Sequence, residues 1–492
     1  DAYQYGLKYP ASNQTILYEK FHEIINNPNW NGILVLKATI DLQEFPQELK
    51  GLLSGIDLNR FNAHHFGIEM SKVNSEGEIR MEKSSSLFGL INYLDVAYQQ
   101  QLMQGLNDNK PVPSLDGAPY DFKVLQLQVL FENTAIKFFQ SKVQLTMNNL
   151  FSDKVIGTNN KYGADNLNTI VLAGTYEDHN GTAVYVFENT DDNLFYFDSN
   201  LLKNVEITKI QFNTLTTDPQ ASYIESRFAM WGYLNYGVMK TTLPNALGDD
   251  GTTALMDAFS FGNGDGTDGD IIDGLNYSNL YIDMAFDINT PSVVSYGFDA
   301  SQVAFDSNLS TARALSLYPN FALQINNLVS GDKDSLPASL GYLNISLPGM
   351  NTTGLSGDWY GLEMTLNMGT PGELASSLDF NSSVLIAWSP GGKANELSYK
   401  AFVGIKLPGT SSNAKLLSLQ GVLKLSIDTL KLEYVAAQQS YLMTLNKIAL
   451  KFLGILKLPP GGSTNFLLFG NPTPGATAKS LGWYAAYNKT KS

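Results

Sequence analysis

Hydrophobic and polar residues alternate along most of the chain after residue 122. The alternation is clearest in residues 125–129, 143–147, 282–288, 362–368 and 423–427. A period of two places one side-chain face on a core and the other in water. Turns rich in Gly, Pro, Asn and Asp separate these segments, as expected between short strands. The pattern predicts antiparallel strands that belong to large sheets.

The first 118 residues show a mixed pattern. Residues 32–42 (GILVLKATIDL) predict a buried strand, and residues 46–56 (PQELKGLLSGI) predict a short helix with Pro near its start. Residues 66–70 and 78–81 flank an Asn-Ser-Glu-Gly sequence and predict a hairpin, and residues 95–106 predict a second helix. We therefore expect the helices to be concentrated before residue 120.

Two loops suggest domain boundaries. The first is a Pro-rich loop at residues 107–119, and the second is a Gly- and Asp-rich loop at residues 244–274. They divide the chain into a mixed α/β region (1–118), a β-rich region (119–243) and a β-rich C-terminal region (244–492) that begins with the acidic loop. The sequence shows no repeat of fixed period. We predict a mainly β fold of large antiparallel sheets, arranged as a sandwich or as an extended layered sheet.

Composition narrows the classes of function. The net charge is −15 and the pI is near 4.7, so the surface repels phosphate backbones and nucleic acid is not an expected partner. The chain has no cysteine, which excludes disulfides, thiolate catalysis and Cys-based metal sites and favours a bacterial origin. Its apolar runs are shorter than the roughly 18 residues that predict a transmembrane helix. Because it begins at Asp1, we interpret it as a fragment or a processed product.

The acidic loop is the candidate metal site. Between residues 241 and 312 there are eleven Asp and no Lys or Arg, and the densest part is residues 262–273. Glycine-spaced carboxylates at Asp265, Asp268, Asp270 and Asp273 could supply the hard oxygen ligands that Ca²⁺ takes. The spacing does not fit an EF-hand, because Asp270 stands where that motif needs Gly. The alternative is a hydrated hairpin loop in which Asp and Gly serve the turn geometry.

Other candidate residues carry weaker patterns. His64 and His65 are adjacent, so on a strand they point to opposite faces and do not readily share a metal. No G-x-S-x-G elbow, H-E-x-x-H helix or Walker loop is present in the sequence. A glycosidase leaves no local motif, and the pairs Glu44/Glu48 and Glu177/Asp178 are then only guesses at its carboxylates.

The tryptophans and the C-terminal lysines each have two possible roles. The five Trp sit in apolar sequence contexts, which favours core packing over sugar-stacking platforms. Residues 393–457 hold nine Lys against three acids. These lysines form either a solvated outer face that protects edge strands or a basic patch that docks on acidic neighbours.

Several short strings carry a family resemblance. They are residues 29–33 (NWNGI), 61–67 (FNAHHFG), 84–93 (SSSLFGLINY), 468–472 (LFGNP) and 481–487 (LGWYAAY). Together they resemble the C-terminal region of very long, functionally uncharacterised bacterial proteins. The resemblance implies a bacterial origin and a large parent protein, and it carries no catalytic residue onto this chain.

These observations favour a non-catalytic structural or binding module of a large bacterial surface, secreted or injected protein. Its expected partners are other proteins or further copies within a larger particle, and its expected location is outside the cell or on its surface. The alternatives are a carbohydrate-active enzyme of glycosidase or lyase type and a toxin-like cargo. A deep pocket with convergent acids and aromatics would favour the enzyme.

Overall fold

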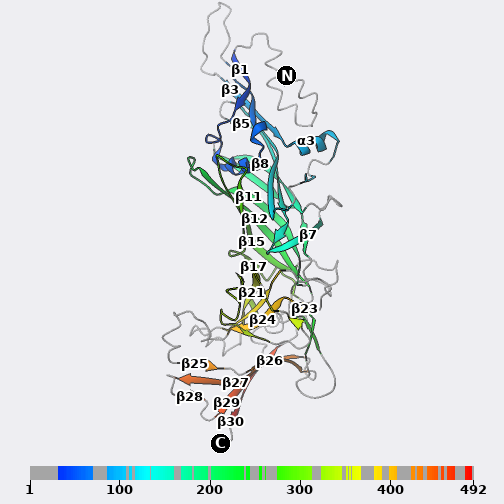
Figure 1. Ribbon diagram of the computed structural model, residues 1–492, viewed down its shortest axis with the longest axis vertical. Coiled ribbons are helices and arrows are strands. Elements are labelled where there is room, and N and C mark those ends of the chain that lie inside the picture. The colour runs from blue at the N-terminus through cyan, green and yellow to red at the C-terminus, as the bar shows by residue number, and fades with distance from the viewer. Residues whose placement is uncertain are drawn as a thin grey trace, which may run out of the picture.

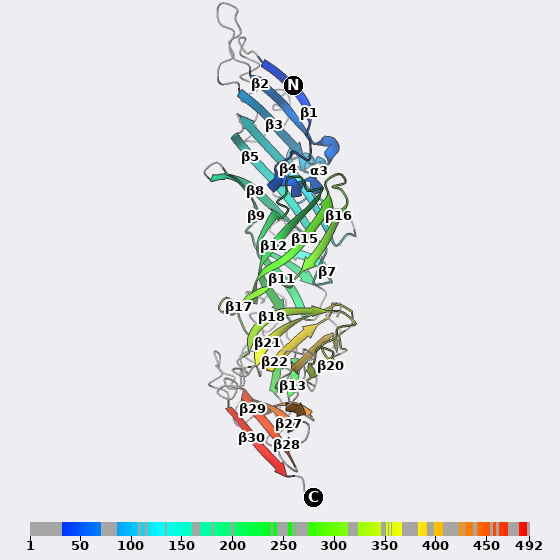
Figure 2. The ribbon, with the colours of Figure 1, turned by 90° about the vertical axis from the view of Figure 1, so that its left-hand side faces the viewer.

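The computed structural model is elongated, with the described N-terminal strands near one end and the C-terminal strands at the other (Figures 1 and 2). The structure describes residues 32–69, 86–106, 110–113, 117–132, 135–159, 168–179, 182–197, 201–237, 240–243, 254–257, 261, 274–312, 323–345, 351–352, 354–355, 357–366, 382–390, 398–406, 423–426, 429–435, 440–452, 456–458, 462–470 and 482–489. Strands dominate these ranges, so the predicted mainly β fold with large antiparallel sheets is confirmed.

The largest sheet in the described part of the chain has 15 strands. Its strands are β1 (Gly32–Thr39), β2 (Asn62–Glu69), β3 (Ser86–Leu94), β4 (Tyr120–Glu132), β5 (Ala135–Met147), β6 (Asn149–Leu150), β7 (Asp153–Asn159), β8 (Thr169–His179), β9 (Thr182–Asn189), β10 (Asn193–Phe197), β11 (Leu202–Thr214), β12 (Tyr223–Tyr236), β15 (Leu275–Asp287), β16 (Val294–Asp299) and β17 (Ala304–Asp306). The order runs β1-β2-β3-β4-β5-β8-β9-β11-β10-β7-β6, and β12 and β15 extend it from β11. All the pairs in this sheet are antiparallel.

The 15-stranded sheet curls, so that strands distant in the pairing order face one another. Phe122 of β4 stacks on Phe212 of β11 at 5.3 Å between ring centroids and meets Phe228 of β12 at 5.6 Å. At the start of β4, Tyr120 lies 5.8 Å from Tyr296 of β16. The inner face is therefore a packed aromatic core, in which offset and edge-to-face ring contacts add to the burial of apolar area.

Helices occur only before residue 104 in the described part, as expected. They are η1 (Gln47–Gly55), η2 (Leu58–Arg60) and α3 (Val96–Met103). Each overlaps or adjoins a segment predicted to be helical, but η1 is a 3-10 helix, with the first bond from Leu49 N–H to Pro46 C=O at 2.9 Å. A Cβ at Gly51 of η1 would overlap Oγ of Ser226 and the ring of Phe212, so η1 lies directly against β11 and β12.

The outer face of β4 and β5 is covered by a second, smaller core. Tyr98 of α3 and Val112 pack with Leu94 and Leu125 on this face. A register shift between Val124 and Gln126 moves Leu125 to this side of the sheet. The prediction that the polar positions of these two strands face water is wrong here. It is correct for β15, where Ile282, Met284 and Phe286 are buried and the side chain of Asp283 is 39% exposed.

A second sheet has the order β18-β21-β22-β24-β19 in the described residues. Its strands are β18 (Gln324–Gly331), β19 (Leu343–Asn344), β21 (Trp359–Leu366), β22 (Ser382–Trp388) and β24 (Ala401–Lys406). Aromatic residues join it to the first sheet. Trp388 contacts Tyr236 at 5.3 Å and Phe151 at 6.3 Å, and Tyr360 contacts Phe151 at 5.2 Å and Phe298 at 6.1 Å. One hydrophobic core therefore runs through both sheets.

A third sheet lies at the C-terminal end of the molecule (Figure 2). It contains β25 (Leu423–Ser426), β26 (Thr429–Val435), β27 (Ser440–Phe452), β28 (Leu456–Leu458), β29 (Gly462–Gly470) and β30 (Gly482–Lys489). Two small pairs complete the described strands, β13 (Lys240–Leu243) with β14 (Ala254–Asp257), and β20 (Asn351–Thr352) with β23 (Ser398–Tyr399), the latter pair being parallel. The domain boundaries suggested at residues 118 and 243 stay predictions.

Candidate functional site

The predicted calcium ligands Asp265, Asp268, Asp270 and Asp273 lie outside the described residues. The same holds for the rest of residues 262–273, so calcium binding by this loop stays a prediction. Within the described ranges, no group of three or more His, Asp and Glu side chains is close enough to hold a metal ion.

The other acidic candidates are dispersed. Glu44 and Glu48 are exposed, the first before η1 and the second within it, while Glu177 is exposed on β8. Glu48 acts on Tyr185 of β9, whose pKa rises to about 12 because of burial and then of this carboxylate. His64 and His65 occupy consecutive positions of β2, where the pairing with β3 shifts register between His64 and Gly67. The side chains of the two histidines and of Asp178 are outside the described part of the structure.

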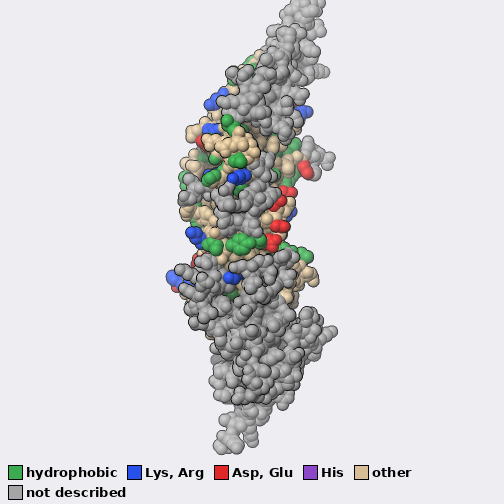
Figure 3. All heavy atoms as spheres, turned by 90° about the vertical axis from the view of Figure 1, so that its right-hand side faces the viewer, with side chains coloured by type: hydrophobic (Ala, Val, Ile, Leu, Met, Phe, Trp, Pro, Cys, Tyr) green, Lys and Arg blue, Asp and Glu red, His purple; other side chains and the backbone are tan. Residues whose placement is uncertain are grey.

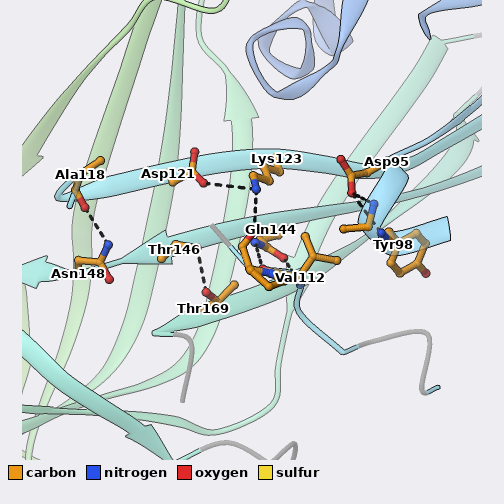
Figure 4. Close-up of polar contacts among 12 residues, drawn as sticks. Asp95, Tyr98, Val112, Ala118, Asp121, Lys123, Gln144, Thr146, Asn148 and Thr169 are labelled. Carbon is orange, nitrogen blue, oxygen red and sulfur yellow. Dashed lines mark hydrogen bonds and ion pairs between the residues drawn. The ribbon is translucent and has the colours of Figure 1, made fainter. Parts of the chain in front are cut away.

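A built polar site lies under α3, on the outer face of β4, β5 and β8 (Figure 4). Its centre is Gln144 of β5, which is fully buried. The side-chain amide of Gln144 makes two hydrogen bonds with the backbone of Val112. The side-chain Oε1 accepts from the Val112 N–H at 2.9 Å, and Nε2 donates to the Val112 C=O at 2.8 Å. A side-chain amide has the donor and acceptor needed for this paired contact. Residues 110–113 (Lys-Pro-Val-Pro), called the strap below, are held in this way.

Further hydrogen bonds fix the connection from the strap to β4. Lys123 donates to the Pro113 C=O at 2.7 Å, and Gln101 donates to the Pro111 C=O at 3.1 Å. Asn148 donates to the Ala118 C=O at 2.8 Å (Figure 4). The Val112 side chain is itself fully buried. The site is thus filled by the chain's own backbone, and it positions α3 over the sheet.

Other buried polar side chains lie on β4, β5 and β8 near this site. The hydroxyl oxygens of Thr146 and Thr169 lie 2.8 Å apart. The side chain of Gln126 donates to that of Gln128 at 2.6 Å, and Gln128 in turn donates to Asn92 at 2.8 Å. Buried polar groups are stable only when they find such partners. The glutamines whose sequence pattern predicts a solvated face are therefore buried and hydrogen-bonded to one another and to Asn92.

We predict that Gln144→Leu destabilises the fold by about 2–4 kcal/mol, because the buried N–H and C=O of Val112 each lose their partner. Denaturant unfolding of the full chain measures the change, and hydrogen exchange of the Val112 amide should become much faster. Gln104→Leu is the matched control, since Gln104 is exposed just after α3. Equal stability of the two variants would show that the strap is not held by Gln144.

An open sheet edge lies at the N-terminal end of the described strands (Figure 2). Among the described residues β1 pairs only with β2, so its outer edge leaves backbone groups without a ladder. Ile33, Val35 and Leu36 of β1 are 56%, 38% and 51% exposed, and the adjacent Ile68 of β2 is 39% exposed. The prediction of a strand here is confirmed, but the prediction that it is buried is wrong. Apolar residues on an unprotected edge are a signature of strand pairing between chains.

The rest of the described surface is less concentrated. On the face shown in Figure 3, uncharged polar side chains and backbone separate small groups of hydrophobic, acidic and basic side chains. The side chains of the strands in residues 423–458 are largely outside the described part, so the proposed basic docking patch stays a prediction. None of the described helices has the length and apolar character to cross a membrane.

Comparison of the chain with protein-family models, with curated proteins and with solved structures found no match.

Proposed function

We propose that this chain is a structural, binding module of a large bacterial surface or secreted protein, and that it joins its neighbours through the outer edge of β1. The observation that carries the proposal is the exposure of Ile33, Val35 and Leu36 on a strand that, among the described residues, pairs on one side only.

Edge strands of monomeric proteins usually carry protection against such pairing. The common devices are proline, several charges, an edge bulge or a covering segment. β1 has the sequence GILVLKAT, with one charge at Lys37 and no proline, and its register with β2 runs without a shift. Main-chain hydrogen bonds along such an edge would give affinity, and the exposed side chains would give specificity.

The body behind this edge suits a load-bearing role. A continuous hydrophobic core runs from β4 and β12 of the first sheet to Trp388 and Tyr360 of the second, so the two sheets can act as one rigid unit. Elongation along one axis places the β1 edge far from the C-terminal sheet (Figure 1). These features support a spacer that presents an assembly edge at one end, and they agree with the parent protein implied by the resemblance.

The test places Val35→Lys in the full parent protein in the bacterium that makes it. A charge in the middle of the edge should weaken assembly at least tenfold, because it must be desolvated when the edge is covered. Gradient sedimentation should show the native assembly shifting to lighter fractions. Val293→Lys is the control, because Val293 is 72% exposed in the turn between β15 and β16. Wild-type sedimentation of both variants would contradict the proposal.

A further inference from the structure

We infer that the partner of the β1 edge is a second copy of the same chain, with the two β1 strands antiparallel and Val35 opposite Val35. This inference rests on the proposed function, since it names the partner of the same edge. It comes from the self-complementary sequence of β1 and from the residues that flank it on β2.

Symmetry limits the possible registers. Two antiparallel strands at the centre of one continuous sheet are related by a twofold axis perpendicular to the sheet, which keeps each side chain on its own face. A residue of β1 can therefore face itself or a residue an even number of positions away. With Val35 on the axis, Leu34 faces Leu36 of the second copy and Ile33 faces Lys37 of the second copy.

This register builds a continuous apolar row on one face. Val35 pairs with Phe66 of β2, and the Phe66 ring lies 6.2 Å from Phe131 of β4. Placing Val35 against its own copy joins the two Phe66–Val35 pairs directly. Aromatic and β-branched residues in facing positions are among the favourable cross-strand pairs.

The opposite face is also complementary. Leu34 pairs with Gly67 of β2, and a Cβ at Gly67 would overlap the ring of Phe88, so Phe88 fills the space that Gly67 leaves. Leu36, which is 51% exposed, would lie against Leu34 of the second copy. Both faces of the edge thus gain apolar neighbours in one arrangement.

Charge disfavours another register. If Lys37 stood on the axis, two ammonium groups would face each other across the strands, which is unfavourable. In the inferred register each Lys37 faces Ile33, which is 56% exposed, and the two lysines lie at opposite ends of the interface. The charged head can then reach solvent while its methylene stem covers Ile33.

The absence of cysteine from the sequence permits a direct test on the purified full chain. Facing residues in antiparallel strands have Cα atoms about 4.5–5.5 Å apart, within the roughly 4.4–6.8 Å that a disulfide spans. Val35→Cys should therefore form a covalent dimer under mild oxidation. Ile33→Cys is the matched control, because two copies of residue 33 would be four positions out of register, about 13 Å apart. A mixture of Ile33→Cys and Lys37→Cys should form the heterodimer.

Sedimentation of the wild-type chain should show a reversible increase from the 53.9 kDa monomer toward twice that mass as concentration rises. Val35→Lys should raise the dissociation constant at least tenfold. Failure of Val35→Cys to cross-link, or equal cross-linking of Val35→Cys and Ile33→Cys, would overturn the inference. If the native assembly is still disrupted by Val35→Lys in that case, the proposed function stands with a different partner. If neither effect occurs, both fail.

Discussion

Replacing Trp388 with alanine is expected to lower the free energy of unfolding by about 3–5 kcal/mol, the range for large buried aromatics. Trp388 is 2% exposed, and its ring lies 5.3 Å from Tyr236 and 6.3 Å from both Phe151 and Tyr360. Tyr236 lies on β12 of the first sheet and Phe151 in the turn between its strands β6 and β7, whereas Tyr360 and Trp388 belong to the second sheet. The cavity would therefore open at the joint, and it would weaken the coupling between the sheets as well as the stability of each.

Calorimetry of the full chain measures this effect. We expect the unfolding transition of the region containing both sheets to move to lower temperature in Trp388→Ala and to broaden or divide, since a joint that no longer packs lets the sheets unfold separately. Trp231→Ala is the control, because Trp231 is only half-buried on β12 and its ring faces Lys209 at 5.3 Å. That cation–π contact accounts for about 0.5–1 kcal/mol. Equal losses in the two variants would show that the aromatic joint does not couple the sheets.

The strands could be predicted because each one carries its own local alternation of apolar and polar residues. In residues 282–288 each apolar residue that faces the core is followed by a residue that faces outward, so period and burial coincide in β15. Burial of the second face could not be predicted in the same way. Gln144 and Thr146 have the polar character of a solvated face, but both are buried: Gln144 bonds the backbone of Val112 in the strap, and Thr146 bonds Thr169 of β8. Nothing in a period of two says what covers the polar side.

The sites show the same limit. The contact between Gln144 and the strap has no sequence motif, because the partner of Gln144 is the backbone of Val112, and any residue except proline supplies the same N–H and C=O. The β1 edge was predicted to be a buried strand from its apolar run, since hydrophobicity alone does not distinguish a central strand from an exposed edge.

The second large effect is expected at alkaline pH. Burial raises the pKa of Tyr236 and Tyr277 well above the ordinary value, and the nearby Glu206 adds to the shift at Tyr277. Burial also raises the pKa of Tyr120, with a smaller contribution from Tyr360, and that of Tyr296, with a smaller contribution from Asp121. All four phenols stay protonated in the folded chain at pH values where an exposed phenol, with a pKa of about 10, has ionised.

The sign follows from proton binding. Below about pH 10 both states hold these protons, so the four tyrosines give no pH dependence of stability there. Above pH 10 the unfolded chain releases protons that the folded chain retains, and each group then costs about 1.4 kcal/mol of stability per pH unit. Four such groups together remove about 5–6 kcal/mol per unit until the folded-state pKa values are reached. Since a domain is stable by only about 5–15 kcal/mol, unfolding is expected between about pH 11 and 12.

Urea unfolding at pH 9, 10, 11 and 11.5, combined with tyrosinate absorbance, checks this expectation. The free energy of unfolding should be nearly constant from pH 9 to 10 and then fall steeply, with a jump in tyrosinate absorbance as the chain unfolds. Tyr120→Phe should reduce the slope above pH 10 by about 1.4 kcal/mol per unit, because one buried phenol no longer titrates. Tyr223→Phe is the control, since Tyr223 is 52% exposed on β12 and its loss should leave the slope unchanged. A stability that stays level through pH 11.5 would contradict the burial of these phenols, and with it the tight closure of β16 against β4 on which the rolled sheet depends.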